Sequence, residues 1–282
     1  RSLKGFQKNG VFKQQKHKFT NKVIKADGVV IGGGIGGSSI SYELSKNNLN
    51  IICIDKEHIF GYHSTGRAAG LFSENYGSNV TKILSIISKE WFDNPPNDCI
   101  TSDQDSIIKP AGLLGVSQQE YQDLLLQNMG PISMDDNSYF AKKSRENVKI
   151  ISKQEALEIN PLLNPDMMGN YAVYEPNAGD FDISLVHQSY MRGCRNNGVN
   201  MICDQNVDKI SKLCNGNWEI VTNINSKNET IYECSLLINA ANAWSNEIAI
   251  LSGLYNENTV PQVYPKRRTI ILFPCDNDEY NT

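Results

Sequence analysis

The chain lacks the patterns that mark membrane, disulfide-rich and metal-binding proteins. In its 282 residues no apolar run approaches the ~20 residues needed to span a membrane. The seven cysteines are scattered, odd in number and without a C-x-x-C pair, which argues against a disulfide framework or a zinc site and favours a reducing, intracellular compartment. The four histidines have no metal-ligand spacing, so no metal site is predicted. The composition, 40% hydrophobic and 21% charged, is that of a globular protein with room for two domains.

Acidic residues are absent from residues 1–25, which hold eight Lys and Arg. The net charge of −4 is therefore divided into +8 on this segment and −12 on the remainder. A basic, acid-free segment is typical of a mitochondrial transit peptide, but this one has a single Arg and few Ser, so a basic N-terminal arm is the alternative. The location is predicted as cytoplasmic or mitochondrial. The acidic body argues against nucleic acid as a partner.

The stretch from Val29 to Asp55 contains a strand, a glycine turn, a helix, a second strand and an acid. Gly32, Gly34 and Gly37 have the G-x-G-x-x-G spacing. In such a turn the first glycine permits the tight bend, the second lets the backbone approach a pyrophosphate, and the third lets the helix pack on the strand. Asp55 stands where a carboxylate accepts hydrogen bonds from a ribose diol. The pattern predicts a dinucleotide site with its phosphates at a helix N-terminus.

Capping residues locate two further helices. Asp182 is predicted to cap a helix that ends near Gly198. Ser152 and Glu155 have the spacing of a capping box before another helix. The chain begins with Arg1 rather than Met and ends just after the strand-like run TIILF, so we expect a fragment at both ends.

Two further runs point to a family. HSTGRAAG at residues 63–70 and NAANAW at residues 239–244 resemble the flavin-contacting segment and the later strand-turn of the D-amino acid oxidase-like (DAO) family of FAD-dependent oxidoreductases. HSTGR…YG…FDNPP at residues 63–96 and PKRRT at residues 265–269 resemble the D-arginine dehydrogenase type of D-amino acid dehydrogenase. The resemblance covers roughly residues 26–275.

The resemblance implies FAD as the cofactor and an α/β fold, α+β overall. A Rossmann-like FAD-binding domain would lie beside a second, antiparallel-sheet substrate domain that is incomplete at the C-terminus. By the resemblance the first domain takes residues 26–90 and 176–254, and the second takes 91–175 and 255–282. Trp244 is expected mainly to pack the helix that follows it. The cofactor-contacting positions implied are Gly32, Gly34, Ile35, Gly37, Asp55, Lys56, Ser64, Thr65, Arg67, Ala68, Ala69, Val207, Ala240, Ala241 and Trp244.

Three positions depart from the family pattern. Asn242 replaces the glycine of N-A-A-G-A-W, and Asn is the best alternative if this position needs a positive φ. Leu71 stands where D-arginine dehydrogenases place a histidine near the substrate, and Ala111 stands where an acid would hold a guanidinium. Without that acid a cationic side chain is not selected, so D-arginine is not predicted as the preferred substrate.

Two residues are the candidates for substrate contact. Arg267, in a basic triplet at the expected start of a strand, could grip a carboxylate bidentately, and a solvated basic rim is the alternative. Tyr76 matches a family tyrosine on a mobile loop over the active site, and an ordinary core or surface tyrosine is the alternative.

The predicted reaction is hydride transfer from a D-amino acid, or a similar small amine, to the flavin, with the cofactor performing the redox step. Relatives that oxidise sarcosine, glycine or a 2-hydroxy acid would carry the same motifs. A flavin-binding protein without turnover, acting in assembly of a larger complex, is a second class. A NAD-binding protein is a third, and residues 63–70 argue against it. The electron acceptor stays open between oxygen and a quinone or other carrier.

Overall fold

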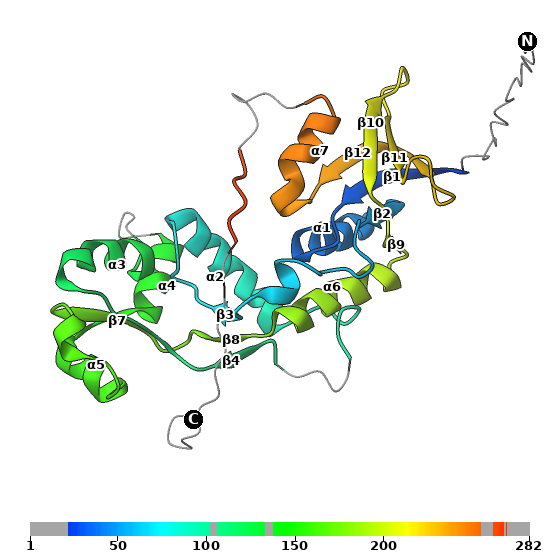
Figure 1. The fold of residues 1–282 in the computed structure, drawn as a ribbon. Coiled ribbons are helices and arrows are strands. Elements are labelled where there is room, and N and C mark those ends of the chain that lie inside the picture. Colours follow the sequence, from blue (N-terminus) through cyan, green and yellow to red (C-terminus); the bar gives the residue numbers. More distant parts are fainter. Residues whose placement is uncertain (1–21, 102–105, 133–137, 255–261, 268, 270–282) are drawn as a thin grey trace, which may run out of the picture.

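The computed structural model describes residues 22–101, 106–132, 138–254, 262–267 and 269 (Figure 1). Two lobes lie side by side, and the larger is built on a six-stranded sheet in the order β10-β11-β12-β1-β2-β9. Strand β1 pairs in parallel with β2 and β12, and β2 with β9, whereas β10, β11 and β12 are antiparallel. These strands are β1 (Lys22–Ile31), β2 (Ile51–Ile54), β9 (Asn200–Ile202), β10 (Val207–Lys212), β11 (Trp218–Thr222) and β12 (Thr230–Asn239).

Helices cover both faces of this sheet. Val29 and Ile31 of β1 pack toward α7 (Ser245–Leu251), whereas Val30 packs toward α1 (Ile35–Ser45) and α6 (Ile183–Asn196). Successive side chains of a strand point to opposite faces, so a strand covered on both sides needs a continuous apolar run. The β-branched run before the glycine turn meets that need.

The smaller lobe has two antiparallel three-stranded sheets, β3-β8-β4 and β5-β7-β6. Its strands are β3 (Leu71–Phe72), β4 (Ile108–Pro110), β5 (Leu113–Gly115), β6 (Lys149–Ser152), β7 (Tyr171–Glu175) and β8 (Gly179–Phe181). Its helices are α2 (Asn79–Asp93), α3 (Gln122–Met129), α4 (Tyr139–Asn147) and α5 (Lys153–Ile159). Short 3₁₀ turns are η1 (Thr65–Arg67), η2 (Gln119–Tyr121), η3 (Pro165–Met167) and η4 (Asn242–Trp244). The predicted fold class, mixed α/β with additional antiparallel sheets, is confirmed.

The predicted caps are also confirmed. The Asp182 carboxylate accepts a hydrogen bond from the Leu185 N–H at 2.8 Å, and Gly198 has a φ of 78° two residues after α6. Ser152 and Glu155 form the reciprocal capping box at the start of α5.

Strand β1 starts earlier than predicted. Residues 22–26 pair with the first half of β12, so the end of the segment predicted as a basic arm belongs to the sheet. A lone strand pattern could not show this, because the partner lies more than 200 residues away.

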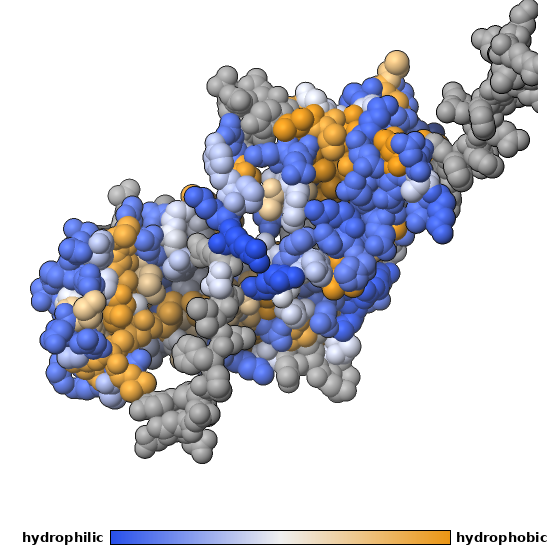
Figure 2. Space-filling view, in the orientation of Figure 1, coloured by the Kyte–Doolittle hydropathy of each residue, from blue (hydrophilic) through white to orange (hydrophobic). Residues whose placement is uncertain are grey.

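Apolar residues are exposed on both lobes of the visible face (Figure 2). Figure 2 shows apolar residues gathered over the lobe that carries α3 and α5. Tyr121, Leu124, Leu162 and Met167 are each more than half exposed there. Within the described ranges no helix is both long and apolar enough to cross a membrane.

Candidate functional site: a pocket at the ends of β1 and β2

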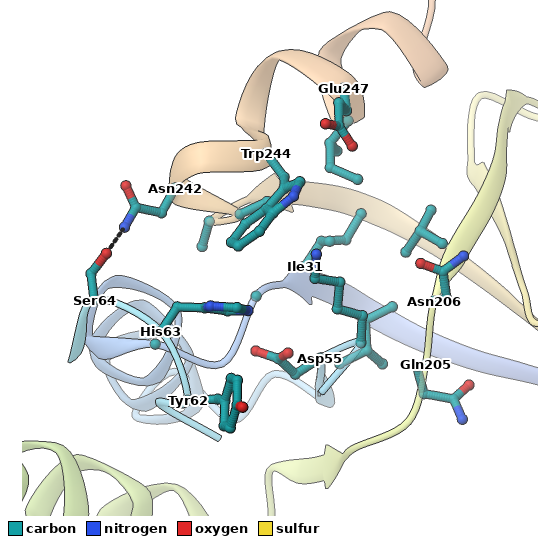
Figure 3. Close-up of a pocket in the computed structure, with 18 of the residues that line it drawn as sticks. Ile31, Asp55, Tyr62, His63, Ser64, Gln205, Asn206, Asn242, Trp244 and Glu247 are labelled. Carbon is teal, nitrogen blue, oxygen red and sulfur yellow. Dashed lines mark hydrogen bonds between the residues drawn. The ribbon is translucent and has the colours of Figure 1, made fainter. Parts of the chain in front are cut away.

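A pocket opens where β1 and β2 end and α1 begins (Figure 3). Its empty space, including the open mouth, is about 910 Å³. Ligands of open α/β sheets bind outside the carboxyl ends of the strands, which is where this pocket lies. The predicted residues that line it are Gly32, Gly34, Asp55, Lys56, Ser64, Thr65, Val207, Ala240, Ala241 and Trp244.

The first and last glycines of the motif, Gly32 and Gly37, have no room for a side chain. Gly32 has a φ of 109°, and a Cβ there would collide with the carbonyl oxygen of Ala240. A Cβ on Gly37 would collide with the carbonyl oxygen of Gly32. Gly34 is the N-cap of α1 and supplies no capping side chain, while the Thr65 hydroxyl accepts a hydrogen bond from the Ile35 N–H at 3.0 Å. A helix start of this kind offers backbone donors to an anion.

Asp55 is fixed at the end of β2 by two backbone donors. Its Oδ2 accepts from the Gly33 N–H at 2.7 Å, and its Oδ1 accepts from the Glu57 N–H at 2.9 Å. A carboxylate has about four lone-pair directions, so each oxygen can accept one more hydrogen bond. The fixed carboxylate therefore fits a diol that donates two hydroxyls.

Two segments distant in sequence meet across the pocket. The Asn242 side-chain amide donates to the Ser64 hydroxyl at 3.2 Å (Figure 3). Asn242 has a φ of 48°, which confirms that this position needs the left-handed conformation that glycine supplies in the family pattern. The Ala240 N–H donates to the Ile31 carbonyl at 2.9 Å and holds the second segment against β1. The pocket wall is thus tied to the central strand.

Further aromatic and polar residues complete the pocket. Tyr62 and His63 line it beside Trp244, whose ring points into the opening (Figure 3). Gln205 and Asn206 line it before Val207. The side-chain amide oxygen Oε1 of Gln205 accepts hydrogen bonds from the hydroxyls of Thr222, at 2.7 Å, and Tyr232, at 2.9 Å. No sequence signal marks Gln205, because residues of the neighbouring strands β11 and β12 fix it.

Some predicted positions lie away from this pocket. Ile35 and Gly37 belong to α1, behind the turn. Arg67 turns toward Tyr62, with its Nε donating to the Tyr62 carbonyl at 3.3 Å. Ala68 and Ala69 line a second pocket, with an empty space of about 920 Å³, that shares Thr65 with the first. The segment predicted to contact the flavin therefore separates two pockets.

Tyr76 lies in a segment that is held by hydrogen bonds. Its side chain is 59% exposed. The Glu175 carboxylate accepts from the Ser73 hydroxyl at 2.6 Å and from the Glu74 N–H at 2.8 Å, and the Gly77 N–H donates to Asn128. The mobile loop that the resemblance implied is thus anchored at both ends.

Arg267 is exposed, and the described residues 262–267 form no strand, so the predicted strand start is wrong there. The observed anchor of this segment is a pair of bonds between Val263 and the Asn246 side chain. Arg268 and the run from residue 270 lie outside the described residues. Neither Arg267 nor Tyr76 lines the two pockets.

Among the residues that the structure describes, no group of three His, Cys, Asp or Glu side chains could hold a metal ion. The donors at the glycine turn and the fixed carboxylate instead fit a diphosphate joined to a ribose.

Residues 27–281 match the model of the DAO family, described as FAD dependent oxidoreductase. The chain belongs to this family. Its cofactor is FAD. The more specific likeness to D-arginine dehydrogenases stays a prediction.

Two relatives are similar over most of the chain. FAD-dependent oxidoreductase domain-containing protein 1 of Bos taurus is 23% identical in an alignment 279 positions long, which covers 89% of this chain and 55% of the relative. Glycerol 3-phosphate oxidase of Mycoplasma pneumoniae is 22% identical in an alignment 233 positions long, which covers 80% of this chain and 56% of the relative. The chain thus spans about half the length of these relatives.

Solved structures share the fold. An L-alpha-glycerophosphate oxidase from Mycoplasma pneumoniae with FAD bound has a TM-score of 0.66 at 20% identity, covering 82% of this chain and 57% of its own. A glycine oxidase from Geobacillus kaustophilus has a TM-score of 0.64 at 19% identity, and the match covers 81% of this chain and 58% of the oxidase chain. At these identities the likeness shows the fold alone.

Proposed function

We propose that the chain binds FAD in the first pocket and oxidises a small amino acid, a D-amino acid foremost. The observation that carries the placement of the cofactor is the fixed Asp55 carboxylate beside the glycine turn. The ribose diol would donate to Asp55, and the diphosphate would lie at the start of α1 near Gly34 and Thr65. The adenine would then extend toward Val207.

Bound FAD supplies the hydride acceptor, and the chain binds, orients and shields the reactants. The flavin end of the cofactor would follow residues 68–70 toward the second pocket. That pocket carries both signs of charge, with Lys109 beside Asp180 and Asp182. An amino acid is a zwitterion and can satisfy both signs. This mixed charge favours the amino acid class.

Oxidation of glycerol 3-phosphate is the second candidate, because a relative and a solved structure carry that activity in their names. The two carboxylates of the second pocket oppose it, since a doubly charged phosphate ester beside them would be repelled. A relative of glycine oxidase type remains within the proposed class.

The roles of Tyr76 and Arg267 remain proposals. Tyr76 would hydrogen-bond the substrate, and Arg267 would bind its carboxylate. The domain boundaries, the electron acceptor and the cytoplasmic or mitochondrial location also stay predictions.

The test is an anaerobic visible spectrum of the purified chain reconstituted with FAD, before and after each substrate class is added. D-amino acids should bleach the flavin band, and glycerol 3-phosphate should not. Bleaching by glycerol 3-phosphate alone would reverse the choice. A bound flavin that no amine or hydroxy acid reduces would favour the assembly protein without turnover.

A further inference from the structure

Four side chains at the mouth of the first pocket form a closed ring of contacts. The His63 Nε2 lies 2.8 Å from Glu57 Oε1, and the His63 and Trp244 ring centroids are 4.5 Å apart. The Lys56 Nζ lies 3.5 Å from the Trp244 ring centroid and 4.0 Å from Glu57 Oε1. Each member therefore contacts two others.

The ring joins three of the segments that line the pocket. Lys56 and Glu57 follow the acid at the end of β2, whereas Trp244 belongs to η4, more than 180 residues later. His63 directly precedes Ser64 and Thr65. His63 is therefore the residue by which the flavin-contacting segment contacts the other two segments, through Glu57 and through Trp244.

The ring lies at the pocket surface and not in the core. The side chains of Lys56, Glu57 and His63 are 37%, 23% and 39% exposed, and Lys56, His63 and Trp244 line the pocket. Exposed ion pairs and cation–π contacts stabilise a fold only weakly. The hydrogen bond from His63 does hold the pKa of the Glu57 carboxyl below its ordinary value, so the pair interacts.

We propose that His63 is a positioning residue for FAD, holding the three segments at the spacing that the cofactor requires. The inference rests on the proposed placement of FAD in this pocket. Binding Glu57 and packing on Trp244 would order the pocket before FAD arrives, and ordering in advance raises affinity without adding a contact to the ligand.

The experiment measures the FAD dissociation constant of the purified chain by flavin fluorescence, and the thermal midpoint of the FAD-free chain. His63→Phe keeps a ring beside Trp244 and removes the bond to Glu57. We expect it to bind FAD about fivefold more weakly, because preorganised loops are lost, with the FAD-free midpoint unchanged. His58→Phe is the matched control, since His58 contacts Tyr62 but is outside the ring and the pocket lining.

Variants of Glu57 separate a positioning role of His63 from a purely structural one, because they change FAD affinity only if the Glu57–His63 contact matters for binding. Glu57→Gln keeps an oxygen that accepts from His63 and should bind FAD nearly as the wild type does, whereas Glu57→Ala should match His63→Phe. The double variant Glu57→Ala/His63→Phe should bind FAD no more weakly than either single variant, because each substitution removes the same Glu57–His63 contact.

The outcomes separate the inference from the function on which it rests. Wild-type affinity in His63→Phe, or an equal loss in His58→Phe, overturns the inference alone. Loss of affinity that follows a lower FAD-free midpoint overturns it as well. A wild-type chain that takes up no FAD overturns the proposed placement of FAD and the inference with it.

Discussion

The imidazole of His187 on α6 lies 2.9 Å from the carbonyl oxygen of Gly33, measured from its Nε2. The same ring lies under Gly61, where an added Cβ would be 2.8 Å from His187 Cε1. His187 therefore supports both the glycine turn and the segment that leads to Ser64. A carbonyl accepts only, so Nε2 carries the proton in this contact.

The first prediction concerns pH. Burial lowers the pKa of His187, so the folded state keeps the ring neutral. Its contribution to stability is present above the ordinary pKa of about 6.5 and is lost as the pH falls through the lowered value. His187→Gln should cost about 1 kcal/mol at pH 7.5 through the altered buried bond and should lose less stability on acidification. Urea unfolding of the wild type and the variant at pH 5 to 8 measures the stability cost and its pH dependence. An equal slope of the unfolding free energy against pH in the two proteins would contradict the prediction.

Gly37 and Gly36 give a matched pair on one helix. A Cβ on Gly37 would strike the Gly32 carbonyl, whereas one on Gly36 meets nothing within 4 Å. Gly37→Ala should therefore abolish FAD binding and lower the thermal midpoint. Gly36→Ala should stabilise by roughly 0.5–1 kcal/mol, because alanine is the better helix former. If both variants bound FAD alike, the crowding argument would fail.

Asn242 tests the left-handed position beside Trp244. Asn242→Gly and Asn242→Ala both remove the bond to Ser64, but only Ala must be forced to a positive φ. We expect Ala to be less stable than Gly by about 1 kcal/mol. Denaturant midpoints of the two variants give this difference directly. An alanine variant as stable as the glycine variant would show that the backbone relaxes.

The contribution of Glu74 to folding stability depends on pH with the opposite sign to that of His187. Its side chain is 2% exposed, and burial raises its pKa. Its contribution is present below the ordinary carboxyl pKa and is lost as the pH rises through the raised value. Glu74→Gln, which can still accept from Asn147, should be more stable than the wild type by roughly 1 kcal/mol at pH 7, with the gain vanishing near pH 4. Glu146→Gln on the exposed face of α4 is the control and should change little.

Local patterns predicted elements of both lobes. The glycine spacing, the flanking apolar runs and the caps at Asp182 and Ser152 depend on neighbours within a few residues, and the structure has them. The partners of the glycine turn could not be predicted in this way. His187 is 154 residues from Gly33, and no periodicity links them.

Helix α2 shows how tertiary packing overrides a pattern. Val80, Leu84 and Ile87 are more than half exposed, whereas Lys82 is 1% exposed. The Lys82 ammonium donates to the Gly130 and Gln127 carbonyls, at 2.8 and 3.2 Å, and these bonds satisfy the buried charge. The apolar stripe alone would have predicted the opposite orientation, with Val80, Leu84 and Ile87 buried and Lys82 exposed.

The pairing of β1 with β12 also has a consequence for synthesis on the ribosome. Residues 22–26 pair with no described strand except β12, and Lys22 lies opposite Thr230, 208 residues later. At the usual 5–20 residues per second, the first half of the central strand waits roughly 10 to 40 seconds for its partner. The described strands and helices of the smaller lobe are synthesised first, by residue 181. The six-stranded sheet can therefore be completed only after those elements have been synthesised, and until then β1 presents an open edge to chaperones.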